Sequence, residues 1–122
     1  MYKKIGLFVL ACAAAAGPAV AMDVATYLGK VEALRARGIA AMFSSDAQLL
    51  QDEVVSSFAT LRRERLAAVA ARRRPAYCPT DRATLTQPEL LAALTAVPPA
   101  RRAGTQVRDA LKAAFRRKYP CP

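Results

Sequence analysis

Cys78 and Cys121 lie near the middle and at the end of a chain of 122 residues. Whether they pair depends on where the chain works, because disulfides persist in oxidising compartments and are rare in the cytosol. A bond between them would close a loop of about 43 residues and stabilise the fold by about 4 kcal/mol through chain entropy. A domain this small buries only a modest core, so such a bond would supply a large share of its stability.

The first 21 residues have the parts of a bacterial secretory signal in their usual order. Residues 1–4 are a short basic start, residues 5–16 are uncharged and apolar, and Gly17 and Pro18 interrupt any helix before the small residues at positions 19–21. The apolar run is shorter than the ~20 residues that a permanent membrane span needs. We therefore expect residues 1–21 to be a removed signal peptide and residues 22–122 to form a single helical domain in the periplasm.

Cys12 offers a rival reading, because Val9-Leu10-Ala11-Cys12 resembles the lipobox of bacterial lipoproteins. Only eleven residues would precede that cysteine, and a better cleavage site follows nine residues later. Soluble release is therefore favoured over lipid attachment, and the intact mass of the mature protein distinguishes them. Without Cys12, the even pair Cys78 and Cys121 in an exported chain predicts a disulfide.

The charge of the chain limits its partners. It carries 19 Lys and Arg against 9 Asp and Glu. In a cytoplasmic protein this balance would suggest nucleic acid, but export argues against that partner. The remaining inference is a partner of opposite charge, either an acidic protein or anionic lipid head groups.

The sequence lacks the residue combinations on which most catalytic sites depend. The absence of histidine excludes a His-based triad, an imidazole base and His metal ligands. No Gly-rich phosphate loop or Cys-x-x-Cys redox pair is present, and the acidic residues are few and dispersed. We therefore expect a protein that is not an enzyme and holds no cofactor or metal.

Apolar residues recur at helical spacing, and no run alternates as a strand would. A first helix is expected from the N-cap Asp23 to Gly38, followed by a short apolar turn whose Ile39, Met42 and Phe43 are expected in the core. A long helix is expected from Asp46 to the break at Pro75, opened by a capping box of Ser45 and Gln48. Its inward stripe comprises Leu50, Val54, Phe58 and Leu61, extended by Leu66 and Val69.

Two further helices are expected after the loop that holds Cys78. Thr86 and Glu89 form a second capping box, with Pro88 in the first turn, and the double proline at 98–99 ends this helix. Thr105 is expected to cap the last helix, whose apolar face is Val107, Leu111 and Phe115. The sequence thus predicts an all-α fold, a small disulfide-stapled bundle of four to five helices.

Arginines supply the candidate partner-binding residues. Arg72, Arg73 and Arg74 at the end of the long helix, with Tyr77 as an aromatic anchor, form an expected docking edge, because Arg and Tyr dominate binding hot spots. The alternative is a solvated helix face. Arg101 and Arg102 are a second candidate contact, for which the alternative is a loop in water.

The C-terminal half, about residues 76–122, resembles the immunity proteins of type VI secretion systems, the amidase-immunity (Tai) or resistance-associated group. The family pattern has an aromatic-Cys-Pro entry, a helix, a Pro-containing turn, an Ala-Leu helix and an aromatic-Pro-Cys ending. In this chain the entry is Tyr77-Cys78-Pro79, Leu85-Thr86-Gln87 opens the helix, and Val97-Pro98-Pro99 is the turn. The Ala-Leu helix holds Val107 and Ala110-Leu111, and the ending runs from Phe115 to Cys121. Family members often carry further cysteines and a Gly-Tyr segment upstream, and residues 46–74 have neither.

The resemblance implies an all-helical periplasmic protein, often a homodimer, that binds and occludes an injected cell-wall amidase. Only Cys78 and Cys121 carry over from the family pattern, as its structural disulfide. Two alternatives to the immunity role follow from the size, charge and helical content. The first is a periplasmic chaperone or stress protein. The second is a peripheral envelope protein that binds anionic lipid.

Overall fold

The computed structural model describes residues 21–122, so the expected signal peptide and Cys12 lie outside the described residues except for Ala21. The described part has no strand. Its helices are α1 (Val24–Arg37), η1 (Ile39–Phe43), α2 (Ser45–Ala70), α3 (Gln87–Thr95), η2 (Pro99–Gly104) and α4 (Val107–Lys118), η marking a 3-10 helix. The prediction of an all-α, disulfide-stapled bundle is confirmed. None of the helices in this part is long and apolar enough to cross a membrane.

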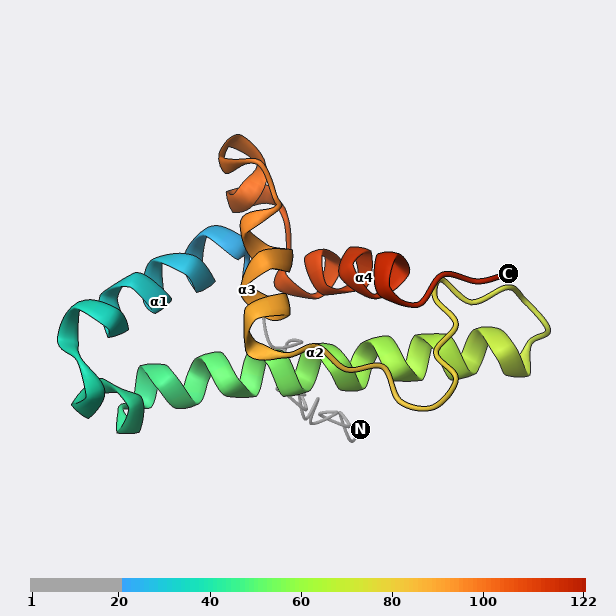
Figure 1. The fold of residues 1–122 in the computed structure, drawn as a ribbon, viewed down its shortest axis with the longest axis horizontal. Coiled ribbons are helices and arrows are strands. Elements are labelled where there is room, and N and C mark those ends of the chain that lie inside the picture. The colour runs from blue at the N-terminus through green and yellow to red at the C-terminus, as the bar shows by residue number, and fades with distance from the viewer. Residues whose placement is uncertain (1–20) are drawn as a thin grey trace, which may run out of the picture.

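Helix α2 is the spine of the molecule (Figure 1). Helix α1 packs on its first half and α4 on its second half, while α3 crosses between them and contacts both. The start of α1 is also tied to the start of α4. The Val24 N–H donates to the Thr105 carbonyl at 2.8 Å, and the Val107 N–H donates to the Met22 carbonyl at 2.9 Å.

The start of α1 follows the prediction, but two other helix starts are shifted by one residue. The Asp23 carboxylate accepts a hydrogen bond from the Thr26 N–H at 2.8 Å, as an N-cap does. Ser44, not Ser45, caps α2 and accepts from the Ala47 N–H, because η1 ends at Phe43 and sets the register. Gln106, not Thr105, is the N-cap residue of α4, since the backbone of Thr105 pairs with Val24.

The end of α2 also differs from the prediction. The helix ends at Ala70, well before Pro75. Arg72 has a positive φ of 56°, which is common at the residue that closes a helix. The Arg73 N–H donates to the Ala68 carbonyl at 2.8 Å and the Arg72 N–H to the Val69 carbonyl at 3.0 Å, which is the Schellman pattern. Arg72, Arg73 and Arg74 therefore lie beyond the helix rather than in its last turn.

The core lies between α2, α3 and α4 and is extended by the start of α1. Its largest fully buried side chains are Phe115, Leu61, Leu94, Leu111, Val24 and Val107. Leu50 and Leu61 of the predicted stripe are buried, and Val54 and Phe58 pack against the core. Leu66 and Val69 do not extend this stripe. Ala68, which follows Leu61 by about two helical turns, continues the buried stripe instead. Leu66 and Val69 are left on the solvent side.

The predicted capping box of α3 is confirmed. The Thr86 hydroxyl accepts from the Glu89 N–H at 3.3 Å, and the Glu89 carboxylate accepts from the Thr86 N–H at 3.1 Å. Lys118 at the end of α4 adds an ion pair of 3.0 Å to the same carboxylate. The hydrogen bond from Thr86 and then that from Lys118 hold the pKa of Glu89 below its ordinary value.

We expect the stability of the fold to fall in acid partly through Glu89. A carboxylate with a lowered pKa stabilises the native state above its unfolded-state pKa, and this contribution is lost as the pH falls through the folded-state pKa. Glu89→Gln keeps an acceptor for Thr86 but cannot titrate, so its urea midpoint should fall less than that of the native protein between about pH 7 and pH 3. The pKa of Asp23 is also lowered, but it contributes to both proteins equally. Parallel pH curves would contradict a role for Glu89.

The predicted disulfide is present. Cys78 and Cys121 are joined with an S–S distance of 2.06 Å and a Cα–Cα distance of 4.9 Å. The Cys78 N–H also donates to the Tyr119 carbonyl at 2.8 Å. The bond fastens the segment after α4 to the segment after α2, as expected from the order of the helices. A disulfide is typical of proteins in oxidising compartments.

Candidate partner-binding surfaces

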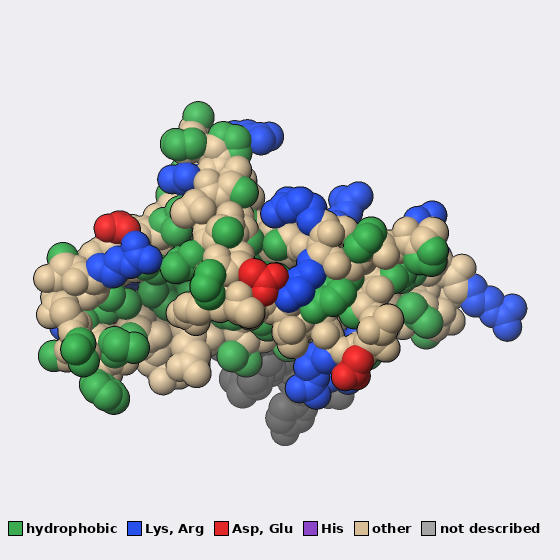
Figure 2. Space-filling view, in the orientation of Figure 1, with side chains coloured by type: hydrophobic (Ala, Val, Ile, Leu, Met, Phe, Trp, Pro, Cys, Tyr) green, Lys and Arg blue, Asp and Glu red, His purple; other side chains and the backbone are tan. Residues whose placement is uncertain are grey.

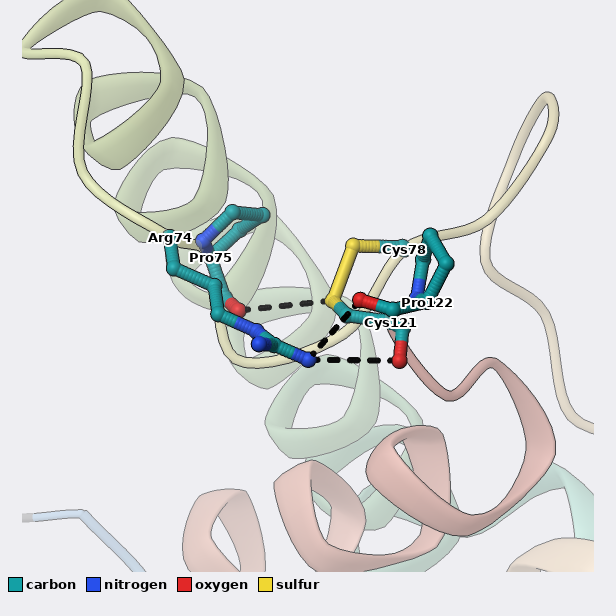
Figure 3. Close-up of a disulfide and its surroundings, with 5 residues drawn as sticks. All are labelled: Arg74, Pro75, Cys78, Cys121 and Pro122. Atoms are coloured by element: carbon teal, nitrogen blue, oxygen red, sulfur yellow. Dashed lines mark hydrogen bonds between the residues drawn. A yellow bond between two sulfur atoms is a disulfide. The ribbon is translucent and has the colours of Figure 1, made fainter.

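The segment beyond α2 forms a basic edge beside the disulfide. Arg72, Arg73 and Arg74 are exposed. Arg74 turns back toward the disulfide, and its guanidinium donates to the main-chain oxygens of Cys121 at 3.3 Å and Pro122 at 3.1 Å (Figure 3). A groove of about 390 Å³ lies here, lined by Arg74, Pro75, Ala76, Arg116, Pro120 and Cys121. Arg116 is a groove residue that the sequence analysis did not single out.

Tyr77 is not the surface anchor that the sequence suggested. Its side chain is only 2% exposed, and its ring centroid lies 5.0 Å from that of Phe115. The Arg65 guanidinium lies over the Tyr77 ring, 5.8 Å from its centroid. Burial raises the pKa of the Tyr77 hydroxyl. The neighbouring disulfide holds this segment against α4, so the aromatic side chain enters the core.

Arg101 and Arg102 are adjacent in sequence but make different contacts. The Arg102 side chain donates to the Val97 carbonyl at 2.8 Å and to the Thr95 carbonyl at 3.0 Å, so it satisfies carbonyls at the end of α3. Arg101 is exposed and lines a second groove, of about 240 Å³, between α3, η2 and α4. Arg117 and Asp109 of α4 also line this groove. Arg101 thus lies apart from the edge formed by Arg72, Arg73 and Arg74.

The basic residues gather in one part of the molecule. From Arg62 onward they outnumber the acidic residues by more than three to one, whereas between residues 22 and 61 acidic residues are in the majority. In Figure 2 Lys and Arg side chains lie around α4 and at the end of the molecule that carries the disulfide, and others lie over α1 and near the top of the view. Both grooves lie in this part, one against Arg116 and the other against Arg117.

The opposite end of the molecule carries an apolar tip, defined here as Ile39, Met42 and Phe43 of η1. These side chains are 81%, 72% and 90% exposed, and the corner between α1 and α2 is rich in hydrophobic side chains in Figure 2. The prediction that these three side chains lie in the core is therefore wrong. A single short turn between two helices can direct only one side inward, and Ala41, 2% exposed, takes that place.

The backbone of the apolar tip is well supported. The Ala41 N–H donates to the Gly38 carbonyl at 3.0 Å, and the Ser44 N–H donates to the Ala41 carbonyl at 3.0 Å. The Ser44 hydroxyl also donates to the Ala41 carbonyl and caps α2. At the base of the tip, Lys30 of α1 forms an ion pair of 3.4 Å with Asp46 of α2. The short apolar turn itself was predicted at these residues, and η1 (Ile39–Phe43) confirms it.

Comparison of the chain with models of protein families, with curated proteins and with solved structures gives no match.

Proposed function

We propose that this chain is an exported periplasmic protein that binds another protein and blocks it by steric occlusion, in the manner of the amidase-immunity proteins that its C-terminal half resembles. The observation that carries the proposal is the apolar tip. Three large apolar side chains exposed together on an ordered turn are unusual for a surface without a partner. Because the turn is held by its own hydrogen bonds, little conformational entropy would be lost on binding.

The proposed location is supported by two separate features. The first 21 residues have the pattern of a secretory signal, and the disulfide between Cys78 and Cys121 needs an oxidising compartment to persist. The periplasm provides that environment. A peptidoglycan amidase injected by a neighbouring cell would act in the same place.

The proposed partner is a cell-wall amidase whose substrate cleft the apolar tip enters. Occlusion needs shape and apolar contact but no catalytic group from this chain. Phe43 would be the central anchor, because aromatic side chains in desolvated pockets dominate binding energy. The distant basic residues would speed the encounter with an acidic partner more than they would tighten the complex.

We expect the protein, purified in oxidised form from the periplasm, to inhibit at least one of a panel of secreted peptidoglycan amidases in a peptidoglycan-hydrolysis assay. Replacing Ile39 and Phe43 together with serine should raise the inhibition constant at least about thirty-fold, the loss of roughly 2 kcal/mol typical of a hot spot. Arg82→Ser, in an exposed loop away from the tip, serves as the control and should change little. Inhibition of no amidase, or equal inhibition by the native protein and the tip variant, would contradict the proposal.

An anionic membrane surface is the second candidate partner, favoured by the same tip with Arg37 just before it in the chain; the neighbouring Arg35 is paired with Glu32 at 3.2 Å. Apolar side chains flanked by cations bind at the interface of anionic bilayers. Vesicles containing phosphatidylglycerol should then co-sediment with the protein at low salt and release it at high salt. Absence of binding at low salt would exclude this candidate.

A further inference from the structure

The main chain just before α1 is held in place by the start of α4. The Met22 carbonyl accepts a hydrogen bond from the Val107 N–H at 2.9 Å, and Asp23 forms an isolated antiparallel bridge with Gln106. The Met22 side chain packs against the core. The fold therefore fixes the position of the Met22 nitrogen, directly after the small residues at which a signal peptide would be cut.

The Met22 nitrogen contacts a carboxylate of α2. Its N–H donates to Oε1 of Glu53 at 3.3 Å, across 31 positions of the chain. Glu53 follows the buried Leu50 by three residues, so it borders the core and is itself half-buried. Burial raises the pKa of the Tyr27 hydroxyl, and the charge of Glu53 raises it further. Glu53 is thus a carboxylate in partly apolar surroundings, close to both Met22 and Tyr27.

Glu53 has no cationic partner within residues 21–122. The ion pairs of this part of the chain use other carboxylates, those of Glu32, Asp46, Glu64 and Glu89. A positive charge close to a half-buried carboxylate favours its charged form. A hydrogen bond of 3.3 Å from a neutral peptide N–H gives much less stabilisation than a charged donor would. A cation at the Met22 nitrogen would therefore complete this site.

We propose that removal of residues 1–21 turns the Met22 nitrogen into an α-ammonium group that binds the Glu53 carboxylate. This inference rests on the export in the proposed function but not on the amidase partner. Hydrolysis of the peptide bond after Ala21 consumes one water molecule and leaves a carboxylate on Ala21 and an amine on Met22. Since an α-amino group has a pKa of about 8, this amine is mostly protonated at pH 7. The neutral hydrogen bond then becomes a charge-assisted one.

The location of the new ammonium group increases its need for Glu53. Helix α1 begins at Val24, and the N-terminal end of a helix carries a partial positive charge that repels a nearby cation. The Asp23 carboxylate is engaged as the helix cap, where it accepts from the N–H and the hydroxyl of Thr26. Glu53 offsets the repulsion. Like the disulfide, this ion pair is completed only after export, so the mature protein is more stable than its precursor.

Protein purified from the periplasm after expression of the full chain tests the proposal, and its intact mass should show a chain that begins at Met22. Inserting Gly-Ser between Ala21 and Met22 keeps the cleavage site but moves the amine two residues away from Glu53. In the native mature protein, Glu53→Gln should raise the equilibrium constant of unfolding about tenfold, as expected when a charged hydrogen bond is weakened. In the insertion variant the same substitution should raise it no more than about twofold. Urea denaturation at pH 7 measures these constants.

Glu32→Gln is the matched control, because Glu32 is an exposed carboxylate whose ion pair with Arg35 lies within α1. Its effect should be the same with and without the insertion. A mature chain that begins elsewhere than at Met22, or a Glu53→Gln effect that the insertion does not reduce, would overturn the proposal. No amidase is present in these measurements. Loss of the coupling between Met22 and Glu53 is therefore distinguishable from a failure to inhibit amidases.

Discussion

Replacement of Phe115 by alanine is expected to lower the free energy of unfolding by about 3–5 kcal/mol. Phe115 is 1% exposed, and three other aromatic rings surround its side chain. Its ring centroid is 5.2 Å from that of Phe58, 5.0 Å from that of Tyr77 and 6.1 Å from that of Tyr119. Truncation would leave a cavity between α2, α4 and the segment that holds the disulfide. Urea denaturation followed by circular dichroism measures the change.

The same chain offers a matched control for this substitution. Phe43→Ala removes an identical side chain from a position that is 90% exposed. Surface substitutions of this kind usually change stability by less than about 0.5 kcal/mol. Similar losses in the two variants would contradict the assignment of Phe115 to the core and of Phe43 to the surface.

The second large effect is expected from the disulfide. Replacing Cys78 and Cys121 together with serine should lower the free energy of unfolding by about 4 kcal/mol, because the unfolded chain regains the entropy of a long open loop. For a domain of this size the melting temperature should fall by about 15 °C or more. Thermal unfolding monitored by circular dichroism gives both quantities.

A reductant provides the control for the disulfide variant. Dithiothreitol should lower the melting temperature of the native protein to that of the double serine variant and leave the variant itself unchanged. Equal melting temperatures for the native protein and the variant under oxidising conditions would show that the bond contributes nothing to stability.

Local signals in the sequence were sufficient to place the starts of α1 and α3. Asp23 and the Thr86–Glu89 pair cap helices through atoms that lie three residues apart, so no distant contact is needed to recognise them. The choice between Ser44 and Ser45 could not be made in the same way, because both are good caps. The preceding turn of η1, fixed by packing of Ala41, decides it.

The surfaces were harder to predict because they depend on tertiary structure. Periodicity marks Ile39, Met42 and Phe43 as apolar but does not say whether another element covers them. Arg74 and Arg116 line one groove only because the disulfide brings their segments together. Tyr77 is buried for the same reason, although an aromatic residue next to arginines is typical of a binding surface.

The left-handed residue at the end of α2 has a consequence for how the protein matures. Each further helical residue would carry the following chain about 1.5 Å along the axis of α2, away from the end of α4. By stopping the helix at Ala70, the turn at Arg72 reverses the chain in time for Cys78 to reach Cys121. A substitution at position 72 that prolongs the helix would therefore slow formation of the disulfide, and newly made chains would stay longer in a reduced, protease-sensitive form.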